Sequence, residues 1–387
     1  MADHALLSPS AAARWLTCTR SAKLEEQFPV SSTKYTEEGT VAHELAELEA
    51  RKVTGYVTPE DYKKTFTEIS ASEYYDETMQ ASAEDYASLV ADYLQIRRGF
   101  SPDAFPEFEV KVDLDKWVPD GFGTADCLII SDGVMEVIDF KYGKGVPVSA
   151  LNNPQMMLYA LGAYEQFKDL YEIDLIEMTI FQPRLNSRST DSVSVKALLE
   201  WGENIVKPQA LKAINGEGEF TPSEKACKFC RAKNVCRARA DKFVELFNDH
   251  KSETLSIDEV AELLNQADDM KAWLSDLEQE VTQNIMTGVI VPGWKMVAGR
   301  SNRKISDELA AVDLLKKNGI NEALLYEKKL ITLTQMEKDF GKKEIDELLK
   351  DLIEKPEGKP CLVKESDKRP PLLFDPFKED NDVPVQQ

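Results

Sequence analysis

The stretch GTADCLIISDGVMEVIDFKYGKG, residues 123–145, places two apolar runs on either side of a short Ser-Asp-Gly turn. Each run has the composition of a buried β-strand, and the turn predicts that the two strands form a hairpin. Asp126, Asp139 and Lys141 interrupt these apolar runs. Because side chains alternate along a strand, we expect Asp139 and Lys141 on one face of the sheet, with Phe140 pointing the other way into the core.

Two carboxylates on neighbouring strands repel one another unless something neutralises them. A divalent cation does so, and oxygen ligands suit Mg²⁺ or Mn²⁺. A lysine beside them adds a charge that holds an attacking water or stabilises a developing oxyanion. Asp126, Asp139 and Lys141 together therefore indicate phosphodiester hydrolysis at a metal site. The alternative is a buried salt bridge between Lys141 and one of the two aspartates.

The hydrophobic periodicity around this hairpin predicts a mixed α/β unit. The expected order is helices over 8–27, 37–53 and 74–98, strands over 108–114, 124–131 and 135–143, a helix over 152–168, a strand over 174–184 and a helix over 194–214. Beyond this unit, the sequence predicts a long acidic helix over 256–287. A short strand or two, including GWKMVAG at 293–299, and several helices are expected over 290–355.

The chain has 387 residues and a formal net charge of -22, which argues against a protein that coats nucleic acid by bulk electrostatics. A local grip through a metal site and a few basic residues stays compatible with this charge. No run of about 18 apolar residues predicts a membrane span, and the N-terminus lacks the pattern of a signal peptide. We therefore expect a cytoplasmic protein without membrane association.

Residues outside the hairpin add to the proposed site. Gln155 and Tyr159 are four residues apart and share one face of a predicted helix. His43, which follows Gly39 by four residues, lies on an earlier predicted helix, where a structural role is the alternative. Glu109 belongs to the strand that precedes the hairpin.

This ordered set of motifs resembles the RecB-type branch of the PD-(D/E)xK nucleases. The matching pieces are Gly39-xxx-His43, Glu109, Gly123-xx-Asp126, Asp139-x-Lys141 and Gln155-xxx-Tyr159. The resemblance covers residues 1–240 and implies a restriction-endonuclease-like core, a mixed sheet flanked by helices.

The resemblance also implies roles for these residues. Asp126 and Asp139 are expected to bind the metal, with the backbone carbonyl of Phe140 and the side chain of His43 completing its shell. Glu109 matches an acidic position of the family.

On the substrate side, the resemblance implies that Lys141 positions or activates the hydrolytic water. Gln155 and Tyr159 are expected to line the DNA side of the site.

Three of the six cysteines, Cys227, Cys230 and Cys236, lie within ten residues, a density that indicates a metal site rather than free thiols. Cys18 is the candidate for a fourth ligand. Both tetrahedral Zn²⁺ and an iron–sulfur cluster accept four thiolates, so the spacing leaves both open. The other two cysteines are a predicted core residue, Cys127, and a poor ligand candidate in the tail, Cys361.

The cysteine order resembles the iron–sulfur subgroup of the RecB-like nucleases, which includes AddB and the CRISPR-associated RecB-like exonuclease. That subgroup has one cysteine before the nuclease core and three after it, and its [4Fe–4S] cluster implies a staple between the two ends of this domain. The segment LSPSAAARWLTC, residues 7–18, is similar to the subgroup's lead-in. The basic residues around the cysteines are expected either to contact DNA or to offset the thiolate charge: Arg231, Lys233, Arg237 and Arg239.

The sequence thus predicts a nuclease domain with its cluster over 1–240, a helical or α+β domain over 241–355, and a Pro-rich charged tail over 356–387. The expected activity is that of a Mg²⁺- or Mn²⁺-dependent deoxyribonuclease, an exonuclease rather than an endonuclease. Similarity of the whole chain to a phage-borne family of unknown function implies a context of phage recombination or replication proteins. The alternatives are a catalytically silent nuclease fold that binds DNA or a partner, and a zinc-stapled interaction protein.

Overall fold

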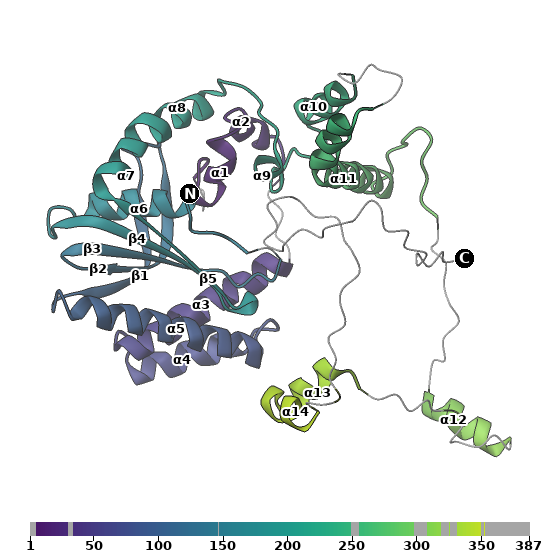
Figure 1. Cartoon of the computed structure of the whole chain (residues 1–387), viewed down its shortest axis with the longest axis horizontal. Coiled ribbons are helices and arrows are strands. Elements are labelled where there is room, and N and C mark those ends of the chain that lie inside the picture. The colour runs from purple at the N-terminus through teal and green to yellow at the C-terminus, as the bar shows by residue number, and fades with distance from the viewer. Residues whose placement is uncertain are drawn as a thin grey trace, which may run out of the picture. The chain divides into compact units, whose positions relative to one another are not determined.

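The computed structural model describes residues 5–29, 34–145, 147–248, 255–297, 308–318, 325, 331–349 and 352. The chain divides into two compact units, Met1–Trp294 and Lys295–Gln387. The first unit contains the sheet (Figure 1) and all the candidate site residues named above. The domain boundary expected near residue 240 stays a prediction.

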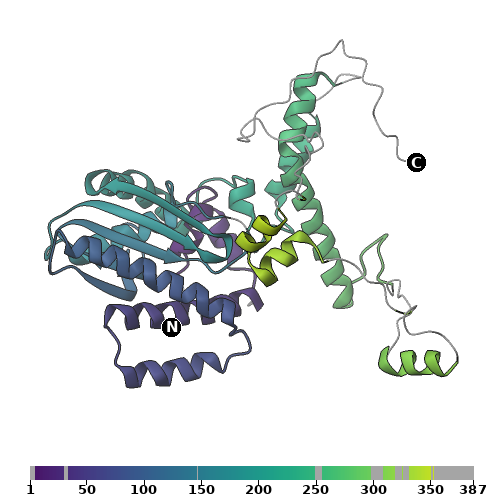
Figure 2. The same ribbon diagram turned by 60° about the horizontal axis from the view of Figure 1, so that its bottom comes forward.

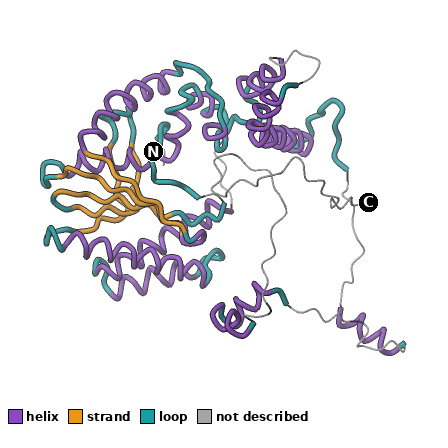
Figure 3. Tube along the Cα trace, viewed as in Figure 1, coloured by secondary structure: helices purple, strands orange, loops and turns teal. Residues whose placement is uncertain are grey.

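A five-stranded mixed sheet forms the centre of the first unit (Figure 3). Its strands follow one another in sequence order: β1 (Phe105–Asp113), β2 (Phe122–Ile130), β3 (Gly133–Phe140), β4 (Ile173–Gln182) and β5 (Ser187–Ser194). The first three strands form an antiparallel meander, β3 and β4 are parallel, and β5 returns antiparallel to β4. The parallel pair needs a crossover between its strands, which α6 (Pro154–Phe167) supplies.

Helices cover both faces of this sheet (Figures 1 and 2). On one face lie α3 (Lys34–Thr54) and α5 (Glu77–Arg98), with α4 (Pro59–Ser70) packed on α3. On the other face lie α6 and α7 (Val195–Trp201). Two separate apolar cores result, and their burial stabilises the sheet between the two helical layers.

The N-terminal segment differs from the single helix predicted over 8–27. It forms three short elements instead: η1 (Pro9–Ala11), α1 (Ala12–Trp15) and α2 (Ser21–Glu25). The break falls at Cys18 and Thr19. The amide of Thr221 donates to Cys18 Sγ at 3.3 Å, and Thr19 Oγ1 donates to the carbonyl of Glu217 at 2.9 Å. Contacts with this distant segment therefore replace the helical continuation that local propensity favours.

The helix predicted over 194–214 is also interrupted. Between α7 and α8 (Lys207–Asn215) the chain makes a π-helical turn, η3 (Gly202–Val206). Pro208 has no amide hydrogen to donate into the helix, which weakens regular α-helical bonding at this point. Gly202 is also needed here, because an added Cβ would come within 2.9 Å of the indole nitrogen of Trp117.

After α8, every regular element in the described part of the chain is a helix. The elements are α9 (Glu224–Cys227), α10 (Arg237–Asn248), α11 (Ile257–Met286), α12 (Glu308–Lys317), α13 (Leu333–Phe340) and α14 (Lys342–Leu348). The strand expected in GWKMVAG is absent from residues 293–297, where the backbone is irregular, and its last two residues lie outside the described part. The Pro-rich tail over 356–387, which includes Cys361, lies outside the described residues as well. Within the described helices, none combines the length and hydrophobicity of a membrane span.

Candidate metal centre and cysteine cluster

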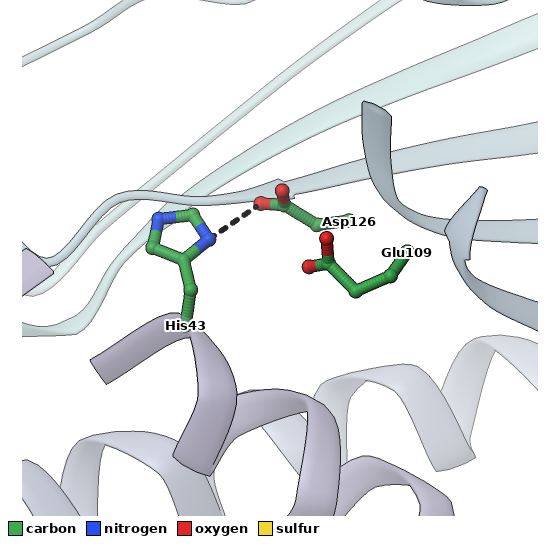
Figure 4. A group of neighbouring side chains, drawn as sticks. All are labelled: His43, Glu109 and Asp126. Carbon is green, nitrogen blue, oxygen red and sulfur yellow. Dashed lines mark ion pairs between the residues drawn. The ribbon is translucent and has the colours of Figure 1, made fainter. Parts of the chain in front are cut away.

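Three side chains from three different elements converge at one side of the sheet. His43 projects from α3, Glu109 from β1 and Asp126 from β2 (Figure 4). One potential ligand atom from each lies within 4.8 Å of the other two. One imidazole and two carboxylates form a donor set that suits a divalent cation such as Mn²⁺. In the described part of the chain, this is the one group of three such side chains that lie so close together.

Glu109 reaches this position through an unusual backbone conformation. Its φ of 51° lies in the left-handed region, which residues other than glycine adopt at a cost in free energy. Phe108 and Val110 flank it, and they pack into opposite cores of the sheet, although residues two apart in a regular strand share one face. The alternation of side chains between the two faces of the sheet is therefore reversed at Glu109.

Asp126 lies opposite Glu109 on β2, and the alternation of side chains between the two faces of the sheet is also reversed there. Cys127 packs with α3 and α5, whereas Ala125 packs with α6. Pairing of β1 with β2 is regular on both sides, so the two inversions compensate one another. As a result, two acidic side chains are presented together where the strands change face.

The carboxylate of Asp126 is held by two partners. The backbone amide of Phe140 donates to Oδ2 at 2.7 Å, and Nδ1 of His43 lies 3.4 Å from the same oxygen. Burial alone would raise the pKa of Asp126, but His43, Lys141 and the Phe140 amide outweigh it and lower that pKa. Asp126 is therefore ionised and oriented before any ligand binds.

Glu109 and His43 behave differently from Asp126. The side chain of Glu109 is partly exposed, but its pKa is raised to about 7. Desolvation by the surrounding protein is the largest cause, and the negative charges of Asp126 and Glu47 add to it. Burial acts against protonation of His43, but Asp126 outweighs this and raises the pKa of the imidazole above its usual value. A proton on either side chain competes with a cation for the ligand atom, and the pKa of Glu109 makes this competition depend on pH near neutrality.

Asp139 lies in a second group, with residues of the β3–α6 crossover. Lys141 Nζ is 2.9 Å and 3.0 Å from its two carboxylate oxygens. Gln155 Nε2 donates to Asp139 Oδ1 at 3.3 Å and to the hydroxyl of Tyr159 at 3.1 Å. Phe140 points to the opposite face and is buried there, as predicted. The carboxylate of Asp139 does not belong to the group of His43, Glu109 and Asp126.

The charge of Lys141 is fixed by its surroundings. Burial by itself would lower the pKa of Lys141, but the Asp139 and Asp126 carboxylates outweigh it and hold that pKa above its usual range. Lys141 is therefore a stable cation, suited to orienting a water or stabilising negative charge rather than to accepting a proton.

Gly123 has a packing reason for being glycine in this region. An added Cβ would lie 2.6 Å from Pro9 Cγ and 2.9 Å from Tyr159 Cε1. A side chain here would push Tyr159 away, and with it the hydroxyl that accepts from Gln155.

An open pocket of about 780 Å³ contains the group of three. Lys141 and Arg184 also line it, with further side chains from the N-terminal half of α3. Sequence reasoning did not single out Arg184, although it is the last residue of the strand predicted over 174–184.

The four cysteines predicted as ligands line one cavity of about 20 Å³: Cys18, Cys227, Cys230 and Cys236. A tetrahedral zinc site with Zn–S bonds of 2.3 Å would bring its sulfurs to about 3.8 Å from one another. Among the described residues, no three cysteine sulfurs lie within 4.8 Å of one another. Both groups expected from the sequence, Zn²⁺ and a [4Fe–4S] cluster, therefore stay predictions for this site. Cys127 is a fully buried core residue, as predicted.

The basic residues around the cysteines have acidic partners. The guanidinium of Arg239 is buried and lies 2.6 Å from Asp276, and the ammonium of Lys233 lies 2.7 Å from the same side chain. The amide of Arg231 donates to Glu25 at 2.7 Å. Arg237 is exposed. Burial raises the pKa of Cys227, and the charge of Arg239 opposes this rise. These contacts favour structural and thiolate-offsetting roles over DNA contacts for Arg231, Lys233 and Arg239.

The fold and these two side-chain clusters define a mixed α/β protein whose five-stranded sheet has helices on both faces. Residues 4–370 match a family described as "Protein of unknown function (DUF2800)", and the chain belongs to that family. Among solved structures, a crystal structure of SSO0001 is similar, with 16% sequence identity and a TM-score of 0.24. The match covers 57% of this chain and 94% of that chain.

Proposed function

We propose that this protein is a metal-dependent deoxyribonuclease with a PD-(D/E)xK-type site. The observation that carries the proposal is the convergence of His43, Glu109 and Asp126 within 4.8 Å, beside the Lys141–Asp139 pair. The motif order in the sequence supports the same reading. The expected substrate is DNA with a free end, so exonuclease activity is proposed over endonuclease activity, in a phage recombination or replication context.

The chain's own residues have distinct parts in this proposal. His43, Glu109 and Asp126 would hold the cation, whose chemistry is to polarise a phosphate oxygen and lower the pKa of a bound water. Lys141, held by Asp139, orients the water or stabilises charge on the phosphate. Gln155 and Tyr159 fix the position of Asp139. Metal ligation by Asp139 and by the carbonyl of Phe140, which the family resemblance implies, stays a prediction.

We further propose that the four cysteines hold a [4Fe–4S] cluster, with Zn²⁺ as the alternative. The observation that supports this proposal is that all four cysteines line one cavity. Since Cys18 is more than 200 residues from Cys227 in the sequence, such a cluster would fasten the two ends of the sheet-containing domain together.

The test of the activity is cleavage of end-labelled single- and double-stranded DNA by anaerobically purified protein, with Mg²⁺, Mn²⁺ or EDTA. We expect metal-dependent cleavage by the wild type, at least a hundredfold slower in Asp126→Asn, because this change removes a charge that binds the cation. Asp174→Asn, an exposed carboxylate at the start of β4, is the matched control and should cleave like the wild type.

One observation favours a second candidate, a catalytically silent fold that binds DNA or a partner protein. The Lys141–Asp139 ion pair neutralises its own charges without a ligand. In that case no metal would support cleavage by protein with an intact cluster. Cleavage that persists unchanged in Asp126→Asn would contradict the proposed metal site.

A further inference from the structure

Arg184 lies in the wall of the metal pocket, on the short helix η2 (Pro183–Leu185) that follows β4. Its side chain is 12% exposed. Of the three basic side chains that line this pocket in the described part of the chain, Lys141 is paired with Asp139, and the others are Lys144 and Arg184. An anionic substrate that enters the pocket therefore finds few cations, and Arg184 is one whose side chain is held in the wall.

The contacts of Arg184 fix its position but use only part of its hydrogen-bonding capacity. Nη1 donates to Glu38 Oε1 at 2.7 Å and to the carbonyl of Tyr142 at 3.5 Å. The guanidinium carbon lies 4.2 Å from the centre of the Tyr142 ring. The ring is buried and forms a firm support beneath the guanidinium.

Within the described part of the chain, the other nitrogens of this guanidinium lack hydrogen-bond partners. Nε is buried without a hydrogen-bond partner among the described residues. Nη2 forms no hydrogen bond with these residues either. A purely structural arginine normally satisfies its planar fork on carboxylates or carbonyls, since buried N–H groups without partners are unfavourable. The donors Nε and Nη2 of Arg184, which are free within the described residues, therefore suit a ligand from outside the chain.

We propose that Arg184 binds a phosphate of the nucleic-acid backbone beside the scissile bond, and that Glu38 holds the guanidinium in place until that phosphate binds. The inference rests on the proposed nuclease function. The planar fork of arginine matches the oxygens of a phosphate. The Glu38 carboxylate and the phosphate are both anions, and they compete for the same positive charge. Removing the charge of Glu38 should therefore strengthen DNA binding, whereas removing Arg184 should weaken it.

The test is binding of fluorescein-labelled oligothymidylate, followed by fluorescence anisotropy with Ca²⁺ in place of Mn²⁺. Arg184→Ala should weaken binding about tenfold, the loss expected for one charged hydrogen-bonding group. It should also reduce the slope of log K against log salt by about 0.7, because one phosphate contact is lost. Glu38→Gln should bind more tightly than the wild type. Lys116→Ala, which removes an exposed partner of Glu165, is the control and should leave binding unchanged.

If the Arg184–Glu38 ion pair has only a structural role, Arg184→Ala and Glu38→Gln should change DNA affinity in the same direction. Weaker or unchanged binding by a folded Glu38→Gln protein would therefore overturn the inference. Arg184→Lys keeps the charge but not the fork and should bind with intermediate affinity, which covers the case that Arg184→Ala does not fold. No measurable DNA binding by the wild type would also overturn it.

A parallel cleavage assay with Mn²⁺ separates this inference from the proposed function. Opposite shifts in binding without any cleavage by the wild type would support the phosphate site and refute the nuclease. Cleavage that Asp126→Asn abolishes, combined with shifts of equal sign, would support the nuclease and refute the role of Arg184.

Discussion

At the scale of single residues, the most informative position is Glu109, because its backbone is strained and its side chain is a candidate ligand. Glycine adopts a φ of 51° without the cost that a glutamate bears. We expect Glu109→Gly to raise the free energy of unfolding of the metal-free protein by about 1 kcal/mol. The same variant should bind Mn²⁺ at least tenfold more weakly.

Thermal unfolding with and without Mn²⁺ measures both effects of this change. Glu109→Gln is its control, since it keeps the strain but removes the charge: it should lose Mn²⁺ affinity, and the stability that Glu109→Gly gains beyond Glu109→Gln measures the strain alone. A Glu109→Gly protein that is less stable than Glu109→Gln would show that the left-handed conformation carries no strain.

The protonation of His43 and Glu109 makes cation binding depend on pH. The pKa of Glu109 is raised to about 7 and that of His43 lies above its usual value. Below these values both side chains are protonated and compete with the cation, so affinity for Mn²⁺ should rise with pH through neutrality and level off once both are deprotonated. Calorimetric titrations in buffers of different ionisation enthalpy should detect proton release near pH 7. Affinity that is constant from pH 6 to pH 8 would exclude these two groups as ligands.

The sequence singled out His43, Asp126, Asp139, Lys141, Gln155 and Tyr159, and the structure brings them to one region in two groups. A salt bridge between Lys141 and one of the aspartates was an alternative from the sequence, but the sequence could not reveal which aspartate pairs with Lys141, or that Glu109 joins Asp126. That division depends on the left-handed backbone at Glu109, which reverses the alternation of β1. No local signal in FEVKV marks such a reversal. Arg184 escaped notice because its significance comes from the pocket around it.

At the scale of elements, the strands and helices with strong apolar patterns were predictable, and the others were not. β2, β3, α5 and α6 lie within a few residues of their predicted ranges. β5 was missed because the sequence SRSTDSVS is polar and its strand alternates between exposed and half-buried positions. The break at Cys18 was missed because it results from contacts with residues 217–221, which no local pattern encodes.

The cysteine cluster is the element-scale feature with the largest expected effect on stability. A group bound by both Cys18 and Cys227 would close a loop and lower the entropy of the unfolded chain, which corresponds to about 5 kcal/mol in the loop-closure description used for crosslinks. Cys230→Ala should therefore lose both the bound group and most of that stabilisation. Iron and sulfide analysis, visible absorption and denaturant unfolding measure these losses, with Cys127→Ala as a control that removes a core thiol but no ligand. A Cys230→Ala protein that keeps its absorption and its stability would contradict the staple.

At the scale of the whole molecule, the net charge of -22 opposes the approach of DNA. Nucleic acid must then be held by local groups, and both proposed ones, a bound cation and Arg184, lie in the same pocket. The described acidic side chains of that pocket would repel a phosphate when no cation is present. Metal and nucleic acid should therefore bind cooperatively, since each reduces the electrostatic cost of the other.

The N-terminal segment contacts residues that lie beyond the sheet and more than 200 positions further along the chain. Arg14 donates to the carbonyl of Phe229 at 3.1 Å, and the amide of Arg231 donates to Glu25 at 2.7 Å. In effect, the chain from Arg14 to Arg231 forms a ring closed by non-covalent bonds. A protease that cuts one exposed turn of this ring, such as the turn between α4 and α5, opens it without separating its parts. The two fragments would then stay associated, and the nicked protein would migrate as one species until denatured.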